Sequence, residues 1–147
     1  MKKIVIATLL ATAALTASAL EVGIIGTTEY TGDNSNGGGI TLGTKVGPVG
    51  LTASLEQNDT LSQTRSSVVA DHGLFKVGII TVQARAGVAH LNNKTATDGY
   101  AMTVGVGALY PLTKSTAATL AFDRQYGQDR VQSFDGNRLT VGLKTSF

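Results

Sequence analysis

Apolar and polar residues alternate along most of this chain after Leu20, with a period of two. In the last segment, 139–147, every second residue from Leu139 to Phe147 is Leu, Val, Thr or Phe, and the residues between are small or charged. A period of two is that of a β-strand with one apolar face. The chain is therefore expected to consist of strands, each with an apolar and a polar face.

Polar and glycine-rich stretches interrupt this alternation at regular intervals. They predict seven connections, alternately longer and tight, at 33–38, 47–48, 58–63, 78–79, 92–98, 111–115 and 127–135. Seven connections imply eight strands of about ten residues, which is near the length that crosses a bilayer at a tilt. In bacterial outer-membrane barrels the short turns face the periplasm and the longer loops face outward.

The composition of the two faces separates a membrane barrel from a soluble one. In segment 100–110 one face is apolar with a tyrosine at each end, and the other consists of small and polar residues. This second face, with its small and polar residues, cannot fill the core of a water-soluble barrel. A soluble barrel of the lipocalin kind is the alternative fold. Because Arg or Lys at the lipid midplane costs about 2–4 kcal/mol, the charged face is expected inside. The sequence thus predicts an all-β fold, an eight-stranded antiparallel up-and-down transmembrane β-barrel.

The same assignment of faces predicts a set of inward charges of both signs. These residues are Glu29, Lys45, Glu56, Asp71, Arg85, Asp123, Arg138 and Lys144. They are expected to pair, because an unpaired buried charge is costly. Eight strands leave an interior that side chains just fill. We therefore expect a lumen plugged by charged side chains, and a narrow channel for small solutes is the alternative.

Aromatic residues fall where girdles at the two membrane interfaces would lie. Tyr30, Tyr100 and Tyr126 are expected at the outer strand ends, and Tyr110 and Phe147 at the periplasmic ends. Aromatic residues make up only 5% of the chain and tryptophan is absent, so these girdles are thin. A histidine, His72, also falls on the outward face near the periplasmic side, unless a bulge turns it inward.

The first nineteen residues follow a different pattern. Lys2 and Lys3 precede an apolar stretch that ends in the small residues Ala17, Ser18 and Ala19. This is the pattern of a secretory signal peptide. We expect residues 1–19 to be a signal peptide, cleaved after Ala19, and residues 20–147 to form the barrel domain. An N-terminal membrane anchor is the alternative.

Charge and cysteine content exclude several kinds of function. Without Lys2 and Lys3 the chain has ten basic and ten acidic residues, so no basic face indicates nucleic acid. Cysteine is absent, which excludes a disulfide framework, a thiolate metal site and a lipoprotein anchor. No cluster of His, Asp and Glu has the spacing of metal ligands, and no cofactor is expected.

Residues 20–147 resemble the small eight-stranded outer-membrane barrels, the OmpA transmembrane-domain/OmpX/Ail-like superfamily. The likeness lies in the terminal strand 139–147, the segment 84–89 and the strand–turn–strand 104–113. It implies a location in the bacterial outer membrane, with outer-membrane lipid and the barrel-assembly machinery as partners. The residues that would form the C-terminal assembly signal are Leu139, Val141, Leu143 and Phe147.

The sequence contains no clear catalytic motif. Some eight-stranded barrels are lipid A deacylases with a His-x-Ser motif on a lipid-facing strand. His90 lies outward near the outer end of its strand, but Asn92 stands where that motif has serine. We therefore expect a monomer without enzymatic activity, with a structural role or a surface-interaction role through four short polar loops. The channel is the second hypothesis, and a lipid A-modifying enzyme is the third.

Overall fold

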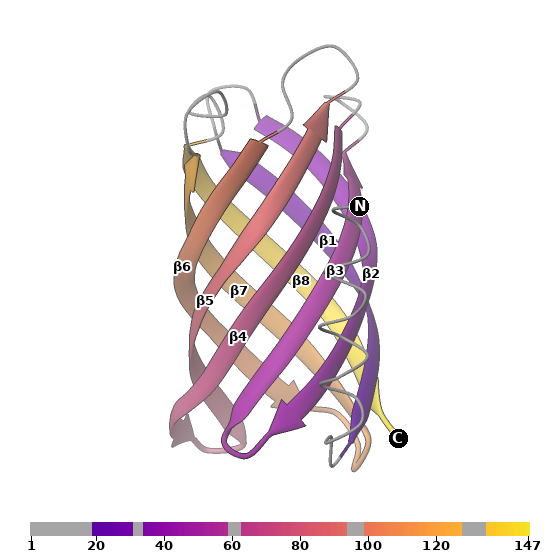
Figure 1. Cartoon of the computed structure of the whole chain (residues 1–147). Helices are drawn as coiled ribbons and strands as arrows, with labels where there is room; N and C mark the ends of the chain where they lie inside the picture. Colours follow the sequence, from indigo (N-terminus) through magenta and orange to yellow (C-terminus); the bar gives the residue numbers. More distant parts are fainter. Residues whose placement is uncertain (1–18, 31–33, 59–62, 94–98, 128–134) are drawn as a thin grey trace.

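The computed structural model describes residues 19–30, 34–58, 63–93, 99–127 and 135–147, and in this part of the chain eight strands form one sheet (Figure 1). The strands are β1 (Leu20–Tyr30), β2 (Asn34–Val46), β3 (Val49–Asn58), β4 (Gln63–Val77), β5 (Ile80–Asn93), β6 (Gly99–Pro111), β7 (Thr116–Gly127) and β8 (Gly136–Ser146). Each strand pairs antiparallel with its sequence neighbours, and β8 pairs with β1. The predicted fold, a closed eight-stranded up-and-down barrel, is confirmed. No helix among the described residues is long and apolar enough to span a membrane.

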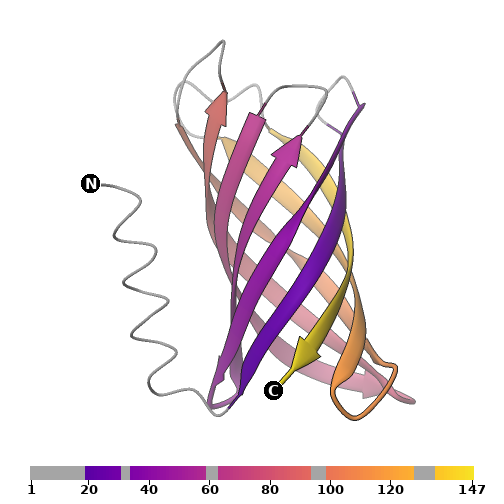
Figure 2. The same ribbon diagram turned by 90° about the vertical axis from the view of Figure 1, so that its right-hand side faces the viewer.

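The first and last strands close the barrel. Their register runs from the pair Glu21 and Ser146 to the pair Tyr30 and Asn137, and the two strands lie side by side in Figure 2. The backbone N–H of Phe147 extends the pairing by donating to the carbonyl of Leu20 at 2.9 Å. Closure removes the free sheet edges, whose unpaired backbone groups would each cost several kcal/mol in lipid.

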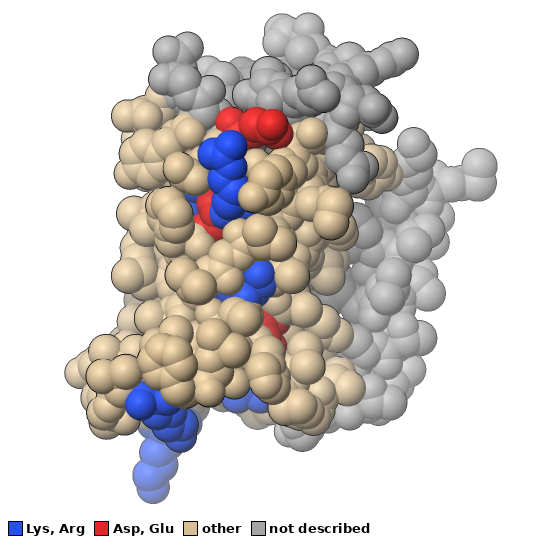
Figure 3. Space-filling view, turned by 90° about the vertical axis from the view of Figure 1, so that its left-hand side faces the viewer, with Lys and Arg blue, Asp and Glu red and all other residues tan. Residues whose placement is uncertain are grey.

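The two faces of the wall differ as the alternation predicts. On β6 the outward side chains of Met102, Val104 and Val106 are 43–54% exposed, whereas Thr103 between them is buried. Large apolar side chains are exposed around the barrel, and most of the buried side chains are polar or charged. The face in Figure 3 is accordingly mostly uncharged. A surface of this extent suits lipid, because soluble monomers rarely expose large contiguous apolar patches.

Tight turns lie at one end of the barrel. Gly47 and Gly78 each have φ of 60°, a left-handed conformation that glycine adopts at little cost, and they join β2 to β3 and β4 to β5. The C-terminus lies at this same end (Figures 1 and 2). Short turns face the periplasm in bacterial barrels, so we name this end the periplasmic end and the opposite one the extracellular end, as expected for a barrel in the outer membrane.

The strands are longer than the sequence predicted, at 10 to 15 residues. The predicted loop 33–38 was wrong for residues 34–38, which belong to β2, and predicted loop residues 58, 63, 92, 93, 111 and 127 also lie in strands. Gly and Asn are typical of turns, but here they occupy positions opposite residues 26–30 of β1. The backbone ladder between β1 and β2 continues regardless, up to the pair Tyr30 and Asn34.

A bulge interrupts the periplasmic half of β4, but it begins after His72. The register with β5 shifts between Gly73 and Phe75, so that Leu74 and Phe75 are both exposed. His72 itself is exposed, and its Nδ1 lies 3.2 Å from the carbonyl oxygen of Pro48. The side chain therefore lies on the outward side, which decides between the two orientations that the sequence left open.

The predicted signal peptide lies almost entirely outside the described residues, Ala17 included. Ala19 is described, and its carbonyl accepts a hydrogen bond from Oγ1 of Thr44 at 3.1 Å. Strand β1 begins at the next residue, Leu20. Cleavage after Ala19 stays a prediction.

Candidate functional site: the charged interior

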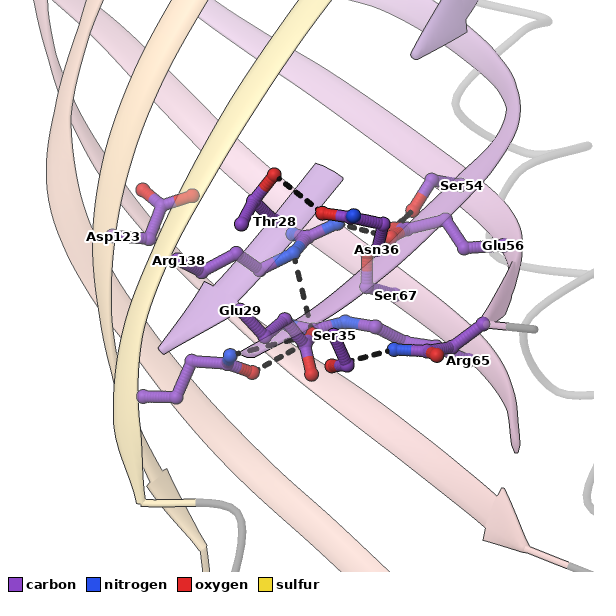
Figure 4. A network of polar contacts seen from close by, with 12 residues as sticks. Thr28, Glu29, Ser35, Asn36, Ser54, Glu56, Arg65, Ser67, Asp123 and Arg138 are labelled. Carbon is purple, nitrogen blue, oxygen red and sulfur yellow. Dashed lines mark hydrogen bonds and ion pairs between the residues drawn. The ribbon is translucent and has the colours of Figure 1, made fainter. Parts of the chain in front are cut away.

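Inward positions from several strands bring charged side chains together near the extracellular end of the lumen. We call this group the outer cluster; it consists of Glu29, Glu56, Arg65, Gln125 and Arg138, from β1, β3, β4, β7 and β8. Each of these side chains is at least nine-tenths buried. Figure 4 shows the four charged members of the outer cluster, Glu29, Glu56, Arg65 and Arg138, converging from opposite sides of the barrel.

Arg138 connects two carboxylates in the outer cluster. Its Nη2 donates to Oε2 of Glu56, and its Nε lies 3.5 Å from Oε1 of Glu29. Glu56 is held in turn by Ser54, whose hydroxyl donates to Oε1 at 2.6 Å and lies 2.7 Å from the hydroxyl of Ser67. Hydrogen bonds to an ionised group strengthen in a buried environment. The guanidinium thus ties β8 to β1 and β3 across the lumen.

Arg65 and Gln125 complete the outer cluster from the other side. Nη1 of Arg65 lies 3.0 Å from Oε1 of Glu29 and also donates to the amide oxygen of Gln125. The Gln125 amide nitrogen donates to the same Glu29 oxygen at 3.5 Å. Neither residue was among the charges and polar groups predicted to lie inside. Their spacing could have revealed them, because Arg65 lies an even number of residues from the inward Asp71, and Gln125 from Asp123.

A second ion pair crosses strand β6. Nη1 of Arg85 on β5 lies 3.5 Å from Oδ2 of Asp123 on β7, and Gly105 occupies the position between them. A Cβ at Gly105 would overlap the backbone oxygen of Phe122 and the carboxylate of Asp123. Gly107 similarly leaves room for the stem of Arg85. The inward glycines of β6 therefore make space for long side chains that lie flat across the wall.

Replacing Arg85 by alanine is expected to lower the free energy of unfolding by about 1–3 kcal/mol. The Asp123 side chain, 2% exposed, would lose its ion-pair partner. The measurement is the urea midpoint of the purified barrel in detergent micelles. Lys114→Ala in the exposed turn 112–115 is the control and should leave the midpoint unchanged. Equal midpoints for the wild type and Arg85→Ala would remove Arg85 from the charged interior.

The periplasmic mouth carries a third group of charges. Nζ of Lys144 lies 2.7 Å from Oε2 of Glu21, and Nζ of Lys45 lies 3.9 Å from Oε1 of the same carboxylate. The Lys45 side chain is 53% exposed, so it lies at the mouth rather than in the interior. Glu21 falls on the inward face that the alternation predicts, yet it was missing from the predicted set of charges.

Asp71 departs from the expected pairing. The alternation predicted that it would join the ion pairs, but among the described residues it has no cationic partner within 4 Å. Instead its Oδ1 accepts a hydrogen bond from Nε2 of Gln83 at 2.7 Å. Arg85 lies directly opposite Asp71 in the register but turns to Asp123. The neutral amide of Gln83 takes the place of the expected cation.

A small polar cavity lies between the outer cluster and the periplasmic mouth. Its volume is about 80 Å³, room for a few water molecules. Its lining includes Thr41, Thr52, Thr119 and Thr140, with Glu56 and Arg138 from the outer cluster and Lys144 from the mouth. The interior therefore contains polar space on the periplasmic side of the buried outer cluster.

The structure places the predicted girdle residues on the outside of the barrel. Tyr30, Tyr100 and Tyr126 lie near the extracellular strand ends, and Tyr110 and Phe147 at the periplasmic end, each 43–79% exposed. The residues of the predicted assembly signal, Leu139, Val141, Leu143 and Phe147, also lie on the outward face of β8 or directly after it. Recognition of this strand by the barrel-assembly machinery stays a prediction.

His90 packs against an aromatic neighbour. Its ring centroid lies 5.0 Å from that of Tyr100, directly opposite on β6, and the rings are tilted by 59°. Ser66 lies opposite on β4, a juxtaposition that the sequence did not suggest, but no hydrogen bond joins the two described side chains. No three His, Cys, Asp or Glu residues of the described ranges are grouped so as to hold a metal ion.

Solved structures of small membrane barrels share this architecture. The N-terminal β-barrel domain of Pseudomonas aeruginosa OprF matches with a TM-score of 0.72 at 19% identity, over 89% of this chain and 98% of that one. Neisserial surface protein A matches with 0.61 at 10% identity, over 88% and 96%. A de novo designed transmembrane β-barrel matches with 0.61 at 13%, over 89% and 97%.

No protein-family model and no curated protein sequence matches the chain. Its fold class is therefore shown by the closed barrel, the apolar outer surface and the charged lumen, together with these structural likenesses. This protein has the fold of the small eight-stranded outer-membrane β-barrels.

Proposed function

We propose that this protein is a monomeric, integral outer-membrane barrel with a structural or surface-interaction role and a lumen closed to solutes. The observation that carries the proposal is the outer cluster, in which Arg138 holds Glu29 and Glu56 together. Side chains from five strands meet there and are almost fully buried. An eight-stranded barrel has little width beyond that of its own side chains, so a cluster of this size supports a plugged lumen.

The ion pairs also supply a reason for the cluster to stay closed. Opening would separate Arg65 and Arg138 from Glu29 inside the barrel, and leaving a buried charge without its partner costs about 3–5 kcal/mol. The polar cavity of about 80 Å³ does not bypass the cluster, because Glu56 and Arg138 form part of its lining. Solutes that enter from the periplasmic mouth would meet these side chains.

Planar bilayer recordings test the closed lumen. The purified wild-type barrel is expected to show no discrete conductance steps, since the outer cluster fills the lumen. The double variant Glu56→Ala with Arg138→Ala removes the pair that links β3 to β8 and should produce small steps. The variant Lys114→Ala, in an exposed turn, is the matched control and should stay silent. Discrete steps from the wild-type protein would contradict the proposal.

A narrow channel for small solutes is the second candidate, and the polar cavity favours it. The cavity, with its threonine-rich lining, reaches from the charged mouth to the outer cluster. In this reading the outer cluster would be a constriction that rearranges, and wild-type conductance in the same recordings would establish it.

We also propose that the barrel is not an enzyme. The ring of His90 packs against that of Tyr100, and His90 is not hydrogen-bonded to the neighbouring Ser66. Nucleophilic catalysis requires a nucleophile and a base within hydrogen-bond reach. Loss of lipid A acyl chains when the protein is expressed would contradict this part of the proposal.

A further inference from the structure

An arginine interrupts the apolar outer surface of the barrel within a strand. Asp123 points into the lumen and is 2% exposed, so the next residue of β7, Arg124, points outward and is exposed. Its cross-strand neighbours are Val104 on β6 and Asn137 on β8. Arg124 lies two residues from Tyr126 of the extracellular girdle, on the membrane side of that residue. It is thus an arginine at the edge of the lipid-facing band.

The contacts of Arg124 draw its guanidinium to the level of the headgroups. Nη1 lies 3.5 Å from the amide oxygen of Asn137, and the central carbon lies 5.7 Å from the ring centroid of Tyr126. Both partners are near the extracellular ends of their strands. An arginine on a lipid-facing wall costs about 2–4 kcal/mol at the midplane and about 0–1 kcal/mol near the interface. Snorkelling along Tyr126 avoids the larger cost.

The guanidinium retains donors for a ligand outside the barrel. Arginine has five N–H groups, and the described protein atoms use one of them, in the long contact with Asn137. No carboxylate of the described residues lies within ion-pair distance of Arg124. Among the described residues of this rim, Asp135 is acidic, and its carboxylate accepts a hydrogen bond from the backbone of Gly127. No carboxylate in the described part of the chain therefore neutralises Arg124, and its guanidinium can take an anion in the membrane interface.

Polar side chains continue from Arg124 along the extracellular rim. The register sets Asn137 opposite Arg124, Tyr30 opposite Asn137, and Asn34 opposite Tyr30, all exposed or half-buried. This row crosses β7, β8, β1 and β2 and offers amides and a phenol beside one cation. Figure 3 shows charged atoms of both signs near the upper end of a mostly uncharged face, with others at mid-height and at the lower end. Such a row suits a headgroup with phosphate and hydroxyl groups.

We propose that Arg124 binds the phosphate of an outer-leaflet lipid headgroup, with Asn137 and Tyr126 holding the guanidinium in place. The planar fork of arginine matches the geometry of phosphate oxygens with two parallel hydrogen bonds. The position of the guanidinium at the extracellular girdle selects a lipid over a phosphate in free solution. The inference rests on the proposed outer-membrane location and adds a specific lipid contact to it.

Native mass spectrometry of the detergent-purified protein tests this contact. The probes are diphosphorylated lipid A, the same glycolipid without phosphates, and inorganic phosphate. The wild type should bind the diphosphorylated form preferentially, and Arg124→Gln should bind it about fivefold more weakly. That factor corresponds to roughly 1 kcal/mol for one basic residue at an anionic lipid surface. Lys114→Gln, a cation removed from the periplasmic turn 112–115, should bind as the wild type does.

The comparison of variants makes the outcome decisive. Equal binding by wild type and Arg124→Gln, or an equal loss in Lys114→Gln, would overturn the inference while leaving the closed barrel intact. Binding of inorganic phosphate as tight as that of the lipid would indicate a free-anion site and would also overturn it. Folding of each variant is checked by the change in gel mobility on boiling. If Arg124→Gln does not fold, Arg124→Lys keeps the charge without the fork and should show weakened binding.

Discussion

Replacing Arg138 by alanine is expected to lower the free energy of unfolding by about 3–5 kcal/mol. The change removes a guanidinium that is 3% exposed and that serves Glu29 and Glu56 together. Glu29 would keep Arg65, but Glu56 would keep only the hydroxyl of Ser54. The carboxylates would then lie in a buried space with too little positive charge. Urea unfolding in detergent micelles, followed by the shift in gel mobility, measures the loss.

Two further variants show whether that loss comes from uncompensated charge. Lys45→Ala removes an inward cation that is 53% exposed at the mouth, and it should cost less than about 1 kcal/mol. Combining Arg138→Met with Glu56→Gln removes both members of the pair and should recover part of the stability. Equal losses from Arg138→Ala and Lys45→Ala would mean that burial in the outer cluster does not matter. That result would contradict the role assigned to Arg138.

Placing an arginine at Val106 is the second change with a large expected effect. Val106 lies near the middle of β6, is 54% exposed, and faces outward between Ala84 and Phe122. A cation there cannot reach either girdle as Arg124 does. The substitution should therefore lower the free energy of unfolding of the vesicle-inserted barrel by about 2–4 kcal/mol. The measurement is urea unfolding of the vesicle-inserted protein, with the folded fraction read from gel mobility.

A variant outside the membrane band provides the control. Leu112→Arg puts the same charge at a residue that is also about half exposed, 51%, but lies in a turn beyond the strands. It should change the free energy of unfolding by less than about 0.5 kcal/mol. If Val106→Arg were tolerated equally well, the outward face would not meet lipid. A water-soluble barrel of the lipocalin kind would then explain the alternation better.

The sequence predicted the wall of the barrel more accurately than its loops. Residues such as Val104 and Thr103 fall on the faces expected from the period of two, because a strand directs successive side chains to opposite sides. The residues 34–38 were assigned to a loop although they form strand, since Gly and Asn are typical of turns. Backbone pairing with β1 outweighed that preference. A run of Gly and Asn is therefore a poor guide to where a hairpin ends.

The charged interior could be predicted only in part. The inward set was largely evident from alternation, and Arg65 and Glu21 follow from the same rule once each strand is assigned a face. The pairing did not follow from the rule, as Asp71 and Arg85 show. These residues lie directly opposite each other, yet Arg85 turns to Asp123 because Gly105 opens that path. Side-chain reach and local space decided between the two carboxylates.

The sequence by itself determined the number of strands, the face each presents to lipid and the presence of both charge signs inside. These properties are local, because they follow from the alternation within one strand and the turn residues between strands. Only the tertiary structure decided that Arg138 meets Glu29 and Glu56, which belong to the other end of the chain. Such contacts depend on the register at which β8 closes onto β1, and on the space left by glycines in the wall. Neither is encoded in any single segment, since both arise when the strands meet.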